Sequence, residues 1–157
     1  MGWKYNVSDF EIKDFGKNKA YFETLADNLY DIFQGEYDGD DTLSQLVFFD
    51  AGDGWRVKYW YEDSSRDCEK TIEQTSEEAE CLRYVLQSFS EAYITGELFS
   101  IHVHLNRVTF FGYTPYSVVY SRNGKKPEFL ISLEEKSEIY CQRLARRWYQ
   151  CVYKNRG

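Results

Sequence analysis

The chain has 157 residues, 26 acidic against 19 basic side chains, a formal net charge of −7, and an aromatic content of 18%. This length can form one domain with its own core, and the aromatic content is too high for an intrinsically disordered protein. The acidic balance argues against binding to nucleic acids or to anionic membranes, because both depend on clustered Lys and Arg. We therefore predict a single domain over residues 1–157, of which residues 1–17 form a loosely ordered N-terminal segment.

The charge is distributed unevenly along the chain. Residues 20–55 carry nine acidic side chains and no Lys, Arg or His, whereas residues 121–157 have a net charge of +5. The first residues lack the apolar stretch of a secretion signal, and no apolar run is long enough to cross a membrane. These features predict a cytoplasmic protein with one strongly acidic region.

The first half of the chain has one helical pattern and three extended ones. Apolar side chains recur at helical spacing over residues 19–34, Gly35 ends this pattern, and the acidic residues 36–41 follow as a predicted loop. Alternating, β-branched and aromatic residues predict strands over 43–49, 55–61 and 68–73.

A second helix begins at a capping box formed by Thr75 and Glu78, in which each residue satisfies a free backbone N–H of the other. Its apolar repeat continues to Tyr93, and Gly96 suits the C-terminal cap. Strands are then predicted over 98–105, 108–113, 116–121 and 128–131, the last two as a hairpin around Asn123-Gly124. In the first of these strands Leu105 is expected to face inward, and His102 and His104 outward.

A last helix is predicted over residues 132–153, with Ser132 and Glu135 as its capping box. Its acidic start and basic end match the helix dipole, which would explain much of the positive charge of the C-terminal region. On such a helix Cys141 and Cys151 lie about 15 Å apart, too far for a disulfide. The order of elements predicts an α+β fold, with three helices flanking an antiparallel sheet of about five or six strands. Whether the strands over 68–73 and 128–131 join this sheet is left open.

Catalytic and metal-binding motifs are missing from the sequence. His102 and His104 lie on one strand face and could bind a metal together, but a site needs a third ligand and the chain has no other histidine. An EF-hand loop needs Glu at its twelfth position, where counting from Asp38 or Asp50 gives an aromatic residue instead. The chain also lacks the P-loop and the nucleophile elbow. We therefore predict no catalytic residue and no cofactor, and keep a small enzyme or metal-binding protein that uses the two histidines as an alternative.

The acidic region contains many aromatic residues, a combination that predicts a protein-binding surface. Carboxylates steer a basic partner into encounter, and large aromatic side chains anchor it. The alternative is that the acids serve solubility and the aromatics fill the core. The residues we expect on the binding surface are Glu36, Tyr37, Asp38, Asp40, Asp41, Asp50, Asp53, Trp55, Trp60, Tyr61 and Asp63.

The segments Trp55–Tyr61, Thr75–Tyr93 and Phe99–Phe111, in this order, resemble the YezG-like immunity proteins of bacterial polymorphic toxin systems. The resemblance implies a small cytoplasmic antitoxin that binds and neutralises a cognate toxin domain. The element order is also similar to type III secretion chaperones and YbjN-like domains, which bind protein segments as dimers. We expect an immunity-type inhibitor of a basic toxin domain, as a monomer or homodimer, with a secretion-chaperone-like protein as the alternative within the same class.

Overall fold

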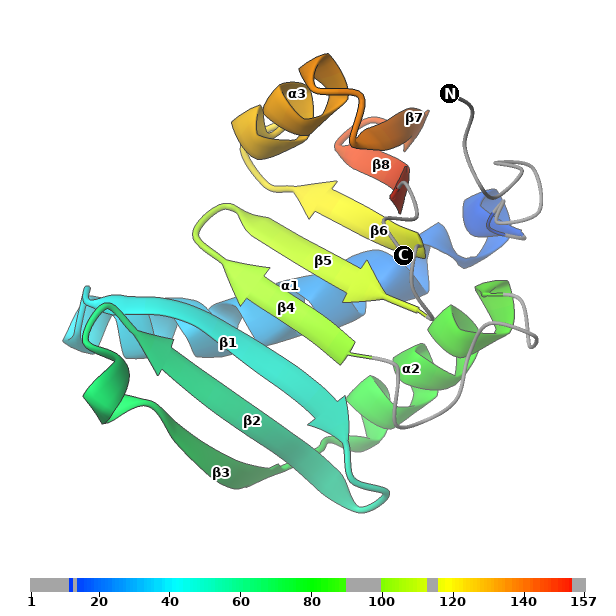
Figure 1. The fold of residues 1–157 in the computed structure, drawn as a ribbon. Coiled ribbons are helices and arrows are strands. Elements are labelled where there is room, and N and C mark those ends of the chain that lie inside the picture. The colour runs from blue at the N-terminus through cyan, green and yellow to red at the C-terminus, as the bar shows by residue number, and fades with distance from the viewer. Residues whose placement is uncertain (1–11, 13, 90–99, 113–115, 154–157) are drawn as a thin grey trace.

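The computed structural model describes residues 12, 14–89, 100–112 and 116–153. Within these ranges the chain forms three α-helices, one short 3₁₀ helix and eight strands (Figure 1). The helices are α1 (Phe15–Gly39), α2 (Ser76–Ser88), α3 (Glu128–Glu135) and the 3₁₀ helix η2 (Ser64–Arg66). The strands are β1 (Leu43–Asp50), β2 (Gly54–Tyr61), β3 (Cys68–Glu73), β4 (Ser100–His104), β5 (Arg107–Phe111), β6 (Tyr116–Ser121), β7 (Ile139–Ala145) and β8 (Trp148–Tyr153).

All eight strands belong to one sheet in the order β3-β2-β1-β4-β5-β6-β8-β7, and every neighbouring pair is antiparallel. The predicted α+β class with three helices and an antiparallel sheet is confirmed. The predicted number of strands is too low, because the chain after α3 forms β7 and β8 and because β3 joins the sheet edge. No helix in the described ranges is both long and apolar enough to span a bilayer.

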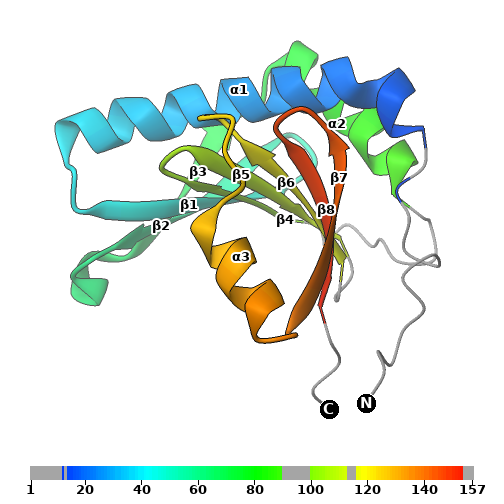
Figure 2. The same ribbon diagram turned by 90° about the horizontal axis from the view of Figure 1, so that it is seen from above.

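The main core lies between the sheet and the two helices α1 and α2, which cover the same sheet face (Figure 2). The apolar face of α1 contributes Phe22, Leu25, Leu29 and Phe33, and all four are fully buried. Burial of this face stabilises the fold, because it removes several large side chains from water. The opposite sheet face is covered by α3 over β6 and β8, where a smaller cluster includes Val119, Leu130 and Cys151.

Both predicted helices of the first half exist, with shifted ends. The structure extends α1 to Gly39, so residues 36–39, predicted as a loop, form its last turn. The capping box of Thr75 and Glu78 is present at the start of α2, but the helix ends at Ser88 rather than near Gly96. The backbone of Phe89 is already extended, and residues 90–99 lie outside the described part of the chain.

The prediction fails after residue 127. Residues 128–131, predicted as a strand, begin α3, and residues 139–153, predicted as helix, form the β7–β8 hairpin. The segment from Trp148 to Val152 is buried at every position, because β8 lies inside the sheet between β6 and β7. A strand buried on both faces does not alternate between apolar and polar residues, so its pattern resembles that of a helix.

Three further predictions are wrong, the first two because residues 139–153 form a hairpin. The basic residues Arg143, Arg146 and Arg147 belong to a hairpin, so a helix dipole does not explain the positive charge of this region. Cys141 and Cys151 are direct partners across the β7–β8 ladder rather than distant residues on a helix. Leu105 follows the end of β4 and is 47% exposed instead of facing inward.

The N-terminal segment that we expected to be loosely ordered is only partly described. Residues 1–11 and 13 lie outside the described ranges, whereas α1 already begins at Phe15. Ile12 is buried, and its backbone N–H donates to Oε1 of Gln150 on β8 at 3.0 Å. This contact places residue 12 beside the sheet.

Candidate functional site

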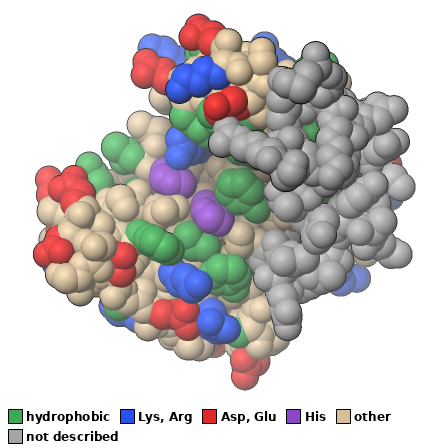
Figure 3. Space-filling model, viewed as in Figure 1, with side chains coloured by type: hydrophobic (Ala, Val, Ile, Leu, Met, Phe, Trp, Pro, Cys, Tyr) green, Lys and Arg blue, Asp and Glu red, His purple; other side chains and the backbone are tan. Residues whose placement is uncertain are grey.

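The acidic residues of the first half gather where the C-terminus of α1 meets the connection between β2 and β3. We name this surface the acidic end; it comprises Glu36, Asp38, Asp40, Asp41, Glu62, Asp63 and Asp67. The two segments lie side by side because Leu43 pairs with Tyr61 in the β1–β2 ladder and the backbone N–H of Glu62 donates to the carbonyl of Thr42 at 2.9 Å. Figure 3 shows acidic side chains gathered at this edge of the molecule.

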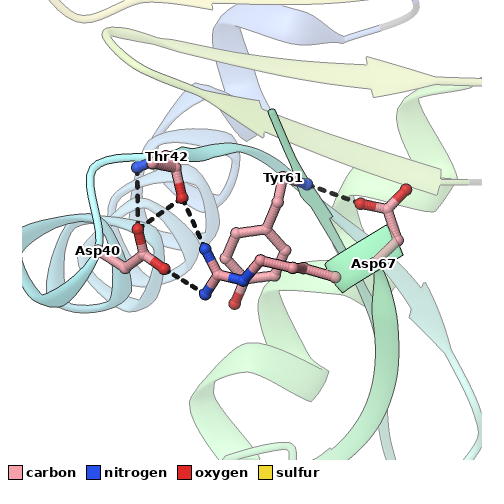
Figure 4. A network of polar contacts seen from close by, with 5 residues as sticks. Asp40, Thr42, Tyr61 and Asp67 are labelled. Atoms are coloured by element: carbon pink, nitrogen blue, oxygen red, sulfur yellow. Dashed lines mark hydrogen bonds and ion pairs between the residues drawn. The ribbon is translucent and has the colours of Figure 1, made fainter. Parts of the chain in front are cut away.

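Asp40 holds the two segments of the acidic end together. One of its oxygens accepts hydrogen bonds from the backbone N–H and the hydroxyl of Thr42, at 3.1 and 2.6 Å, and the other pairs with the guanidinium of Arg66 (Figure 4). These hydrogen bonds, first from the Thr42 hydroxyl and then from Arg66, lower the pKa of Asp40 to about 2. Asp40 is therefore ionised at neutral pH and fixes the turn between α1 and β1.

Arg66 and Asp67 complete this network from the other side. The Arg66 guanidinium lies 4.5 Å from the centre of the Tyr61 ring, in a cation–π arrangement. Asp67 accepts a hydrogen bond from the backbone N–H of Tyr61 at 2.8 Å (Figure 4). Asp63 caps η2 by accepting a hydrogen bond from the backbone N–H of Ser65 at 3.1 Å. The polypeptide that carries the acidic end is thus fixed at several points.

The other carboxylates of the acidic end keep their negative charge uncompensated. Arg66 already pairs with Asp40. Within the described ranges the other six carboxylates of the acidic end form no ion pair; they are Glu36, Asp38, Asp41, Glu62, Asp63 and Asp67. All six are exposed. Trp60 lies near them at the end of β2 and is 43% exposed, an unusual exposure for so large an apolar side chain.

The structure removes Trp55 from the predicted binding surface. Its side chain is fully buried in the main core, because Trp55 and Trp60 stand an odd number of residues apart on β2 and point to opposite faces of the sheet. Tyr37 and Tyr61 are partly buried and pack against the same core. Both side chains are therefore only partly accessible to a partner.

The predicted surface is also divided between two ends of one hairpin. Asp50 and Asp53 are exposed at the turn between β1 and β2, at the opposite end of β1 from Asp41. The eight residues of β1 separate the two groups by about 23 Å, at roughly 3.3 Å per residue. The structure brings Glu36, Asp38, Asp40, Asp41 and Asp63 together and leaves Asp50 and Asp53 apart.

Sequence reasoning missed Glu62, Arg66 and Asp67 at this site. If the predicted strands over 43–49 and 55–61 pair as a hairpin, the residues after 61 lie beside the residues before 43. The register of that hairpin was the signal that could have found them.

The two histidines lie on the sheet face opposite α1 and α2, in the middle of the view in Figure 3. His102 packs edge-on against Phe111, with ring centres 4.5 Å apart, and its Nε2 lies 3.1 Å from the Ser100 hydroxyl. Burial, and then the positive charge of Arg107, lower the pKa of His102 and of His104 to about 4. Both imidazoles are therefore neutral at neutral pH.

A metal site around the histidines would need a third donor close by. Over the described ranges, no group of three or more His, Cys, Asp or Glu side chains is arranged to hold a metal ion. The chain matches no protein-family model, no curated protein and no solved structure.

Proposed function

We propose that the protein is an immunity-type inhibitor that binds a basic toxin domain through its acidic end. The observation that carries the proposal is the set of six exposed carboxylates that form no ion pair with any described residue, next to the exposed Trp60. Uncompensated carboxylates raise the association rate with a cationic partner, and an exposed Trp supplies apolar area that a partner can bury.

The rigidity of the acidic end supports this proposal further. Asp40, Thr42 and Arg66 fix the turn before β1, and Asp67 fixes the end of β2. A surface that is already ordered loses little conformational entropy on binding, so more of the contact energy appears as affinity. The backbone that carries the neighbouring carboxylates is thus ordered before a partner arrives.

Association kinetics with a candidate toxin domain, encoded next to the gene for this chain, test the proposal. The triple variant D38N/D41N/D63N removes three charges from the acidic end and leaves the Asp40–Arg66 pair in place. At low ionic strength we expect its association rate to fall at least about tenfold, with a smaller change in the dissociation rate. Stopped-flow measurement from low to physiological salt should show the difference shrinking as salt screens the charges.

A matched control variant removes the same number of negative charges from other parts of the surface. The variant E73Q/E80Q/E135Q also removes three exposed carboxylates, from β3, α2 and α3. We expect its association rate to stay within about twofold of the wild-type rate. An equal loss in both variants would mean that only net charge matters, and no loss in D38N/D41N/D63N would exclude the acidic end. The variant D50N/D53N tests whether the far end of the hairpin also contributes.

A further inference from the structure

A cleft of about 640 Å³ opens between the β4–β5 turn and the segment that joins β6 to α3. Leu105, Asn106 and Arg107 line one side, and Lys125, Lys126 and Ile131 line the other. The volume lies in the range of sites that bind small molecules. This cleft plays no part in the acidic end and needs its own explanation.

The lining of the cleft is positively charged in a protein that is acidic overall. Arg107, Lys125 and Lys126 supply three cations, against Glu128 as the acid among the lining residues. Lys126 is paired with Glu134 of α3. In the described part of the chain neither Arg107 nor Lys125 forms an ion pair, so two positive charges remain uncompensated.

Arg107 is the unusual cation of the two because it is half-buried. Its guanidinium lies 4.1 Å from the centre of the Phe129 ring. Its Nε is inaccessible to solvent and has no hydrogen-bond partner among the described residues. Burial lowers the pKa of Arg107, since the charged form loses contact with water. An anion that accepts hydrogen bonds from the guanidinium would compensate this cost, because charge-assisted bonds to Arg are strong.

The cleft also offers apolar surface. Leu105 is 47% exposed and Ile131 is 41% exposed, and they are two of the four large hydrophobic residues that are exposed within the described ranges. Both line this one cleft, on opposite sides. A simple inorganic anion would leave these side chains in water, whereas a ligand with an apolar part would cover them.

We propose that the cleft binds a small amphiphilic anion, in which a carboxylate or a phosphate is carried on an apolar chain. Arg107 and Lys125 hold the anionic group, and Leu105 and Ile131 contact the apolar part. Asn106 and Asn123 add amide groups to the lining of the cleft. This site is independent of the proposed toxin-binding function.

Nuclear magnetic resonance titration of the ¹⁵N-labelled chain tests the site with four defined probes. Octanoate and octyl phosphate carry both parts of the proposed ligand, octanol lacks the charge, and inorganic phosphate lacks the apolar chain. We expect saturable shifts at the amides of Leu105, Asn106 and Ile131 with octanoate or octyl phosphate. The tighter of these two identifies the anionic group that the cleft prefers.

Two sets of variants separate this site from general electrostatics. R107Q/K125Q should weaken binding of the preferred probe at least about tenfold, equivalent to 1.4 kcal/mol or more. K125Q alone replaces an exposed residue and provides the same test if R107Q/K125Q does not fold. K17Q/K136Q removes two exposed cations elsewhere and should leave binding unchanged.

Other results would overturn the proposal. Equally tight binding of octanol would show that the charge is not recognised, and equally tight binding of inorganic phosphate would show that the apolar surface is not used. Absence of saturable shifts at these amides, or equal weakening in K17Q/K136Q, would exclude the cleft as a specific site.

Discussion

Asp40 shows that an acidic residue in a predicted binding surface can have a structural role. Its carboxylate bonds to Thr42 and Arg66 and joins the segments on either side of β1 and β2. Substitution of Asp40 would therefore disturb the shape of the acidic end as well as its charge. Binding experiments on this surface are cleaner with Asp38 and Asp41, and with Asp63 replaced by Asn, whose side-chain oxygen can still cap η2.

The lowered pKa of Asp40 predicts a specific pH dependence of stability. Because its pKa in the folded protein is about 2 and its ordinary value is 3.8, its contribution is complete above about pH 4 and is lost as the pH falls towards 2. The D40N variant should melt at a lower temperature than the wild type at neutral pH. The difference in melting temperature should shrink between about pH 4 and pH 2.

The control for this prediction is D41N, which removes the same charge from the next residue without removing these hydrogen bonds. Its melting temperature should stay close to that of the wild type at neutral pH, since substitutions at the surface are usually nearly neutral. A difference between wild type and D40N that stays constant from pH 7 to pH 2 would contradict the role of the Asp40 carboxylate.

At the scale of elements, the sequence predicted the parts whose pattern has one clear period. The helix that contains Phe22 and Leu29, the hairpin of β1 and β2, and the capping box of α2 are all present. The helix α1 and the strand β2 each have one buried face and one more exposed face, so hydrophobic periodicity identifies them directly. Their ends were less predictable, because the last turn of α1 contains acidic residues and glycine, which also suit a loop.

The β7–β8 hairpin could not be recognised in this way. Ser132 and Glu135 have the spacing of a capping box, but they lie inside α3, which begins four residues earlier. The buried β8 lacks the alternation of a strand with one exposed face. Its neighbour β7 ends at Ala145, close in sequence, but its other neighbour β6 ends at Ser121, before α3. The pairing of β8 with β6 therefore depends on the three-dimensional arrangement rather than on any local motif.

The binding surface was predictable only in part, because some of its features are local in sequence and others depend on tertiary packing. The acidic composition located the segment around Asp38 and Asp41, and strand alternation already placed Trp55 and Trp60 on opposite faces. The sequence did not show which face is covered by α1 and α2. That is a tertiary property, and it decides that Trp55 is buried and Trp60 exposed.

The β7–β8 hairpin predicts that Cys141 and Cys151 form a disulfide when the protein is oxidised. Directly opposite residues in an antiparallel pair have Cα atoms about 4.5–5.5 Å apart, within the range of disulfides. The pKa of the Cys151 thiol is raised, first by its hydrogen bond with Cys141 and then by burial, so the two thiols are in contact. Cys141 is the more exposed of the two and should react first.

Hydrogen peroxide is a suitable oxidant for this test. It converts the Cys141 thiolate to a sulfenic acid, and Cys151 then displaces water to form the S–S bond, so one peroxide removes two hydrogens and becomes two waters. Peptide mapping by mass spectrometry should detect the Cys141–Cys151 pair, and C141S should abolish it. The C68S background prevents intermolecular disulfides through the exposed Cys68. Oxidation that yields only sulfinic acid at Cys141 would contradict the prediction.

At the scale of the whole molecule, α1 is joined to parts of the chain that are far away in sequence. The indole N–H of Trp148 on β8 donates to the Glu23 carboxylate at 3.0 Å, and its ring lies 5.2 Å from that of Phe15. Arg122, after β6, pairs with Asp27. These contacts bind the first helix to the last strands of the sheet.

We therefore predict that Trp148 is among the most important residues for stability. Its side chain is fully buried and also stacks on Tyr120. The W148A variant should lose about 3–5 kcal/mol of unfolding free energy, through lost burial and a new cavity. W60A provides a matched control at an exposed position and should change the unfolding free energy by less than about 1 kcal/mol. Denaturant unfolding followed by circular dichroism measures both, and equal losses would contradict this account of the core.

The link between Glu23 and Trp148 spans 125 residues of sequence. At about 5–20 residues per second, a ribosome needs roughly 6–25 s to make the chain between them. Throughout that interval the apolar face of α1 has no β8 to pack against, and Phe22 and its neighbours remain without part of their final covering. A nascent chain of this protein should therefore be a substrate for chaperones that bind exposed apolar helices, until β8 has left the ribosome and closed the core.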